Sequence, residues 1–101
     1  GLAQAAYRAA GVTLPRTAQE QFDAGPQLPT GTPLQPGDLV FFGAGPTDVT
    51  HVGIYVGTTG GQAFMVDAPH TGADVRVEAF PTAIGVSWGT DVYVGATQPG
   101  G

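Results

Sequence analysis

The stretch His51-Val52-Gly53-Ile54-Tyr55-Val56, followed by Ala63-Phe64-Met65-Val66-Asp67, decides the fold of this 101-residue chain. Each segment alternates between two faces, as expected for a β-strand, and the glycine-rich segment Gly57-Thr58-Thr59-Gly60-Gly61 between them predicts an antiparallel hairpin. If that hairpin is centred on the middle of the turn, His51 lies directly opposite Asp67 at its open end. Opposed residues have Cβ atoms about 4.5–5.5 Å apart, so the sequence predicts an imidazole–carboxylate hydrogen bond.

A histidine held by a carboxylate is the arrangement that a general base requires, because the carboxylate fixes the ring tautomer and stabilises the imidazolium. The alternative is ordinary: a histidine near an aspartate at a strand start is often only a surface or capping residue. The residues of the hairpin leave both interpretations open.

The segments around the hairpin predict an α+β fold, with short N-terminal helices packed on an antiparallel sheet of about five strands. Residues 2–10 are strong helix formers closed by Gly11, and Thr17 with Glu20 forms a capping box for a second helix. Residues 25–37 contain four prolines and predict a loop. Further strands are expected at 38–43, 74–78 and 91–96. We expect one domain over residues 1–96 and the start of a flexible linker at 97–101.

Composition narrows the possible partners. The net charge of −5 argues against binding to nucleic acid, and no apolar stretch approaches the roughly 18 residues of a membrane span, so we expect no membrane insertion. Because the chain has few charged residues and no heptads, we expect a monomer. The chain has no cysteine and therefore no disulfide. Gly1 is not a translation start, which favours a processed product or a fragment.

Several segments, taken in chain order, resemble the NlpC/p60 family of papain-like cell-wall peptidases. They are Gly1-Leu2, Leu14-Pro15-Arg16-Thr17, residues 34–42, His51 to Gly57, and residues 67–77. The resemblance implies a papain-like α+β domain of a secreted, extracytoplasmic and cell-wall-associated bacterial protein. Active members cut peptidoglycan stem peptides, typically between D-glutamate and the following diamino acid. By position, His51 would be the general base and Asp67 the residue that orients it.

The family's nucleophile is missing from this chain. In the family an Asp-Cys-Ser-Gly-Leu motif carries the cysteine, and Gly1-Leu2 aligns with its last two residues. Since thiolate chemistry needs a thiol, we expect this chain to be inactive. Three interpretations follow. The chain is a non-catalytic peptidoglycan-binding domain, similar to the RipD type with its substituted nucleophile; or a fragment of an active stem-peptide endopeptidase, truncated just after its catalytic cysteine and therefore without the upstream part of the domain; or a structural or interaction domain with an unused cleft.

Four further residues are candidates for contact with peptidoglycan. Tyr55 shares a strand face with His51, His70 follows the predicted orienting aspartate, Arg16 could pair with a stem-peptide carboxylate, and Trp88 could stack on a sugar ring. The alternatives are a salt bridge for the arginine and a loop anchor for the tryptophan. The spacing of the histidines and acids matches no strong zinc pattern, so we predict no metal site and no cofactor.

Overall fold

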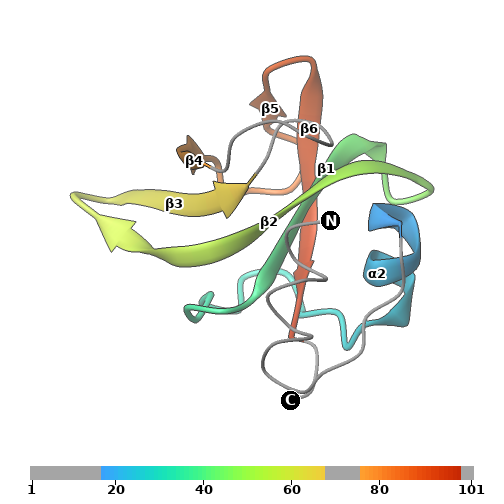
Figure 1. Ribbon diagram of the computed structural model, residues 1–101, viewed down its shortest axis with the longest axis horizontal. Helices are drawn as coiled ribbons and strands as arrows, with labels where there is room; N and C mark the ends of the chain where they lie inside the picture. The colour runs from blue at the N-terminus through green and yellow to red at the C-terminus, as the bar shows by residue number, and fades with distance from the viewer. Residues whose placement is uncertain (1–16, 68–75, 99–101) are drawn as a thin grey trace.

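A computed structural model describes residues 17–67 and 76–98, which form one short helix and a curled six-stranded sheet (Figure 1). Every pairing in the sheet is antiparallel, and the strand order is β4-β3-β2-β1-β6-β5. The elements are α2 (Ala18–Ala24), β1 (Leu39–Gly45), β2 (Asp48–Thr59), β3 (Gln62–Asp67), β4 (Arg76–Phe80), β5 (Ser87–Trp88) and β6 (Asp91–Thr97). The predicted α+β class is confirmed. The predicted helix at 2–10 lies outside the described residues.

Helix α2 begins at the predicted capping box. The Thr17 hydroxyl oxygen accepts a hydrogen bond from the Glu20 amide at 3.1 Å, and the hydroxyl donates to the Glu20 carboxylate at 2.9 Å. With seven residues the helix is too short to be stable alone, so packing must hold it. Phe22 packs on Phe41 of β1 with ring centroids 5.2 Å apart, which fixes the helix against one face of the sheet.

Strand β1 is buried on both sides, so the sheet carries two apolar clusters. On one face are Val40 and Phe42, in a cluster with residues of β2, β3, β4 and β6. On the other are Leu39 and Phe41, which pack with Phe22 of the helix and with parts of β2 and β6. The second cluster anchors the helix, and the first lines the inside of the curl on which the candidate site lies.

The β2–β3 hairpin forms as predicted, but its predicted register is wrong. The turn is the pair Gly60-Gly61, both with positive φ, as a two-residue hairpin turn requires. Ile54 pairs with Val66, which places Gly53 next to Asp67 where His51 was expected. A bulge between Tyr55 and Gly57 shifts the pairing by one residue on the side of the turn.

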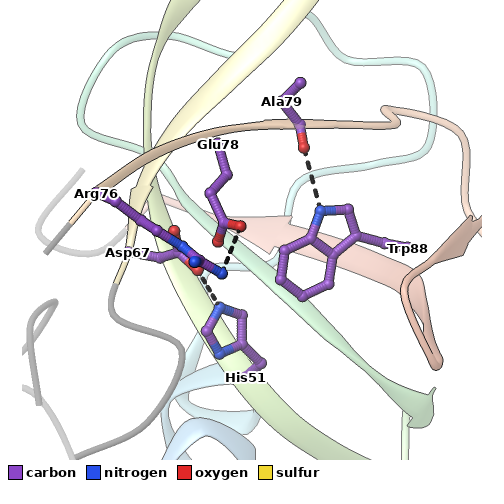
Figure 2. A network of polar contacts seen from close by, with 6 residues as sticks. All are labelled: His51, Asp67, Arg76, Glu78, Ala79 and Trp88. Atoms are coloured by element: carbon purple, nitrogen blue, oxygen red, sulfur yellow. Dashed lines mark hydrogen bonds and ion pairs between the residues drawn. The ribbon is translucent and has the colours of Figure 1, made fainter. Parts of the chain in front are cut away.

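The two edges of the sheet approach each other because the sheet curls. The short strand β5, which the sequence did not predict, pairs with β6 at one edge, and β4 forms the other edge. The Trp88 indole Nε1 on β5 donates to the Ala79 carbonyl oxygen on β4 at 3.1 Å, so one side chain joins the two edges (Figure 2). Strand β6 includes Thr97, one residue beyond the predicted domain boundary, and that residue is fully buried.

None of the helices in the described residues is both long and apolar enough to cross a membrane.

Candidate functional site

His51 and Asp67 are joined by a hydrogen bond, as the sequence predicted. His51 Nε2 lies 2.6 Å from Asp67 Oδ2, and the two side chains are 12% and 0% exposed. The pair lies at the open end of the hairpin, on the inner face of the curled sheet (Figure 2). Because Nε2 faces the carboxylate, Nδ1 is the ring nitrogen that is left to accept a proton when Nε2 carries the hydrogen.

Gly53 makes this pairing possible despite the shifted register. It lies between the histidine and the aspartate on the same strand face, so the two partners meet diagonally. A Cβ at Gly53 would lie 2.5 Å from Met65 Sδ and 3.4 Å from Asp67 Cβ. The missing side chain leaves room for the aspartate to reach the imidazole. The glycine is therefore part of the site although it has no side-chain chemistry.

Trp88 fixes the orientation of the His51 ring. The two rings stack with centroids 5.2 Å apart and an interplanar angle of 17°, and Trp88 also packs on Phe42 at 4.6 Å. Its hydrogen bond to Ala79 holds the indole in place. The described structure thus places Trp88 against the predicted base, and contact with a sugar ring remains a prediction.

Glu78 completes the site, although the sequence alone did not predict its role there. Ligand atoms of His51, Asp67 and Glu78 all lie within 4.8 Å of one another, and Arg76 Nη2 lies 2.8 Å from Glu78 Oε1. Arg76 and Glu78 alternate onto the inner face of β4, which pairs with β3. That alternation was visible in the sequence, but the residues between the strands, 68–75, gave no means of fixing their register.

The two carboxyl groups influence each other's ionisation. Burial raises the pKa of Asp67 to about 6, and its hydrogen bond to Glu78 adds to this effect, while His51 opposes it. Burial also disfavours the charged form of Glu78, but the hydrogen bond from Asp67 and the Arg76 guanidinium outweigh it and lower that pKa. Within residues 17–67 and 76–98, Asp67 Oδ1 and Glu78 Oε2 are buried without another partner, so a proton on Asp67 below about pH 6 would link them.

The other predicted contact residues are not gathered at this pair. Tyr55 is 6% exposed and lies in the core, where its hydroxyl bonds to the Thr58 hydroxyl. It lines a separate cavity of about 660 Å³ under the loop at 28–34, whose described lining does not include His51. Arg16 and His70 lie outside the described residues. The contact roles of all three remain predictions.

Comparison with known proteins gives one family and several relatives. The model of the NlpC/P60 family matches residues 1–92. Over 59 residues the chain is 51% identical to the bifunctional muramidase/DL-endopeptidase CwlT of Bacillus subtilis, covering 56% of this chain and 18% of that protein. It is 40% identical over 72 residues to a probable endopeptidase p60 of Listeria seeligeri, covering 71% and 13%.

A third relative is the peptidoglycan endopeptidase RipA of Mycolicibacterium smegmatis, 32% identical over 83 residues, which cover 82% of this chain and 15% of that protein. The chain therefore spans less than a fifth of the length of each of these three proteins.

Proposed function

The chain belongs to the NlpC/P60 family, and on that premise we propose that it binds the stem peptides of peptidoglycan without cutting them. The family acts on the cell wall, and the named relatives are endopeptidases. This chain contains no cysteine, so the 101 residues supply no thiolate. We place the protein outside the cytoplasm, at the cell wall, as a domain similar to the non-catalytic RipD type.

The observation that supports a binding role is the intact polar site on the inner face of the sheet. His51, Asp67, Glu78 and Arg76 bring donors and acceptors of both charges to one position. A stem peptide carries amide groups and carboxylates, and the exposed guanidinium of Arg76 can pair with a carboxylate. The affinity should be modest, because ordering a flexible peptide offsets part of the contact energy.

Binding can be tested by sedimenting the chain with purified peptidoglycan and by titrating it with a soluble stem peptide. We expect retention on the polymer, and we expect it to fall at least severalfold in His51→Ala. Asp48→Asn, which changes an exposed acid at the start of β2 that is not part of the His51–Asp67–Glu78 cluster, is the matched control. If His51→Ala binds as well as the original chain, the cleft is unused and the domain is a structural or interaction module.

A second function is favoured by one observation, the 2.6 Å contact between His51 Nε2 and Asp67 Oδ2. This is the geometry of a general base with its orienting residue. We therefore propose, as the alternative, that the domain is catalytic when a longer protein supplies the cysteine nucleophile. In that case Nδ1 of His51 would take the thiol proton, and the thiolate would attack the peptide carbonyl. The C–N bond would break as the imidazolium returns the proton to the leaving amine, and water would then hydrolyse the thioester.

This second function is tested by placing Asp-Cys-Ser before Gly1 and following stem-peptide cleavage by mass spectrometry. Cleavage after D-glutamate that disappears in His51→Ala would establish a competent peptidase site. If the variant folds and binds the peptide but does not cleave it, the catalytic alternative is wrong and the non-catalytic binding function stands. The gene sequence immediately upstream of Gly1 gives the natural residue at the nucleophile position.

A further inference from the structure

We propose that His51, Asp67 and Glu78 form a binding site for a divalent transition-metal ion, with Zn²⁺ as the best fit. The ligands would be Nε2 of the imidazole and one oxygen from each carboxylate. These three atoms already lie within 4.8 Å of one another and come from the adjacent strands β2, β3 and β4 (Figure 2). This inference stands on the geometry alone and does not depend on the proposed function.

Two buried oxygens point to a ligand at this position. Asp67 is 0% exposed, and when it is ionised its Oδ1 and the buried Glu78 Oε2 have no hydrogen-bond partner among the described residues. A buried polar atom without a partner costs free energy, more so when it is charged. A cation between the two carboxylates would give both oxygens a partner and reduce the repulsion between them.

The donor set selects the class of metal. One imidazole nitrogen with two carboxylate oxygens suits zinc and its first-row neighbours, whereas Mg²⁺ and Ca²⁺ prefer oxygen ligands alone. Zinc–ligand distances of about 2.0–2.2 Å in a tetrahedron put ligand atoms roughly 3.4 Å apart. His51 Nε2 and Asp67 Oδ2, now 2.6 Å apart, would therefore move apart by about 1 Å. Ligand atoms as far as 4.8 Å apart would draw together by a similar amount, and a water molecule or a substrate carboxylate could take a fourth position.

The side chains around the three ligands do not block the approach of a metal ion to the edge of the His51 ring. Trp88 covers a face of the His51 ring, but a metal binds imidazole in the plane of the ring, at its edge. Coordination would replace the His51–Asp67 hydrogen bond and move the single ring proton to Nδ1. The ring could then no longer accept a proton at Nδ1, so a bound metal and a general-base role exclude each other.

Arg76 opposes metal binding through its charge. Its Nη2 lies 2.8 Å from Glu78 Oε1, and the side chain is 55% exposed. The guanidinium competes for the glutamate and repels a second cation. Removing its charge should therefore strengthen binding, an effect that damage to the fold cannot mimic.

The test uses the 101-residue chain with Zn²⁺ alone, by isothermal titration calorimetry, and with Co²⁺, by its visible absorption. The chain has no thiol, so a cobalt spectrum would report nitrogen and oxygen ligands only. We expect one Zn²⁺ per chain, with affinity at least about tenfold weaker in His51→Ala, Asp67→Asn and Glu78→Gln. Asp48→Asn serves as the control and should bind as the original chain does.

Arg76→Gln keeps the three ligands and should bind Zn²⁺ several times more tightly than the original chain. A zinc-dependent shift of the His51 imidazole resonances in NMR spectra would locate the ion. The proposal is overturned if the chain shows no saturable zinc binding. It is also overturned if the three ligand variants bind zinc as tightly as the control.

Discussion

At the scale of single residues, Gly53 determines whether the polar site can form. Its absent side chain lets Asp67 reach His51 across the hairpin, and a Cβ there would lie 2.5 Å from Met65 Sδ. We expect Gly53→Ala to destabilise the protein by about 1–3 kcal/mol, because Met65 is fully buried and must shift. Urea unfolding measures this difference.

Gly45→Ala is the matched control, since it also lies in a strand but a Cβ there meets nothing within 4 Å. Equal stability losses in the two variants would mean that close packing at Gly53 is not the cause.

Asp67 should fix the tautomer of the His51 ring. Its Oδ2 accepts from Nε2–H at 2.6 Å, which leaves the lone pair on Nδ1. We expect Asp67→Asn to abolish this preference, because the amide can donate to Nε2 as well as accept from it. Nitrogen chemical shifts of the imidazole in NMR spectra distinguish the two tautomers. Unchanged shifts in a folded variant would assign the tautomer to another neighbour, with Asp48→Asn as the comparison.

At the scale of secondary structure, the Gln19 side chain adds hydrogen bonds to the apolar contacts that hold helix α2 on the sheet. Gln19 Oε1 accepts from the Val49 amide at 2.8 Å, and Gln19 Nε2 donates to the Pro46 carbonyl at 2.9 Å. Val49 is 5% exposed, so in Gln19→Ala its amide would lose its partner at a cost of about 1–3 kcal/mol. Thermal unfolding with Gln19→Glu, which retains an acceptor, as the control would measure this. Equal losses in both variants would contradict the role of the Val49 bond.

The positions of the hairpin strands and of helix α2 could be predicted from the sequence, whereas the register of the hairpin could not. Alternating residues located the strands of the hairpin, and Thr17 with Glu20 located the start of α2, because these signals are local. The register was missed because the prediction centred the turn on Thr59, whereas the turn is the pair Gly60-Gly61, itself a strong two-residue turn signal. The bulge near Val56 then shifts the pairing by one residue.

The site was predictable to the extent that it is local. His51 and Asp67 belong to one hairpin, so their spacing was sufficient to bring them together. Glu78 depends on the β3–β4 register and Trp88 on the closure of the curled sheet. Both are long-range features, which the pattern along a single sequence does not determine.

At the scale of the whole molecule, the apolar cluster that contains Phe42, Phe80 and Tyr93 should control stability in alkaline solution. Tyr93 is 4% exposed and packs between Phe42 and Phe80. Burial, with a contribution from the negative charge of Asp38, raises its pKa to about 12. The folded state therefore favours the neutral phenol. This contribution is fully present below about pH 10, the ordinary value for tyrosine, and is lost as the pH rises through 12.

Two pKa units correspond to about 2–3 kcal/mol. We expect the free energy of unfolding to fall by about that much more in the original chain than in Tyr93→Phe between pH 9 and pH 12, because phenylalanine fills the same space and cannot ionise. Urea unfolding at a series of pH values gives both curves. Parallel curves would show that Tyr93 ionises without disturbing the core, and the loss of stability in alkali would then belong to other groups. Diverging curves would place the alkaline limit of the fold in the same aromatic cluster that supports His51 through Phe42 and Trp88.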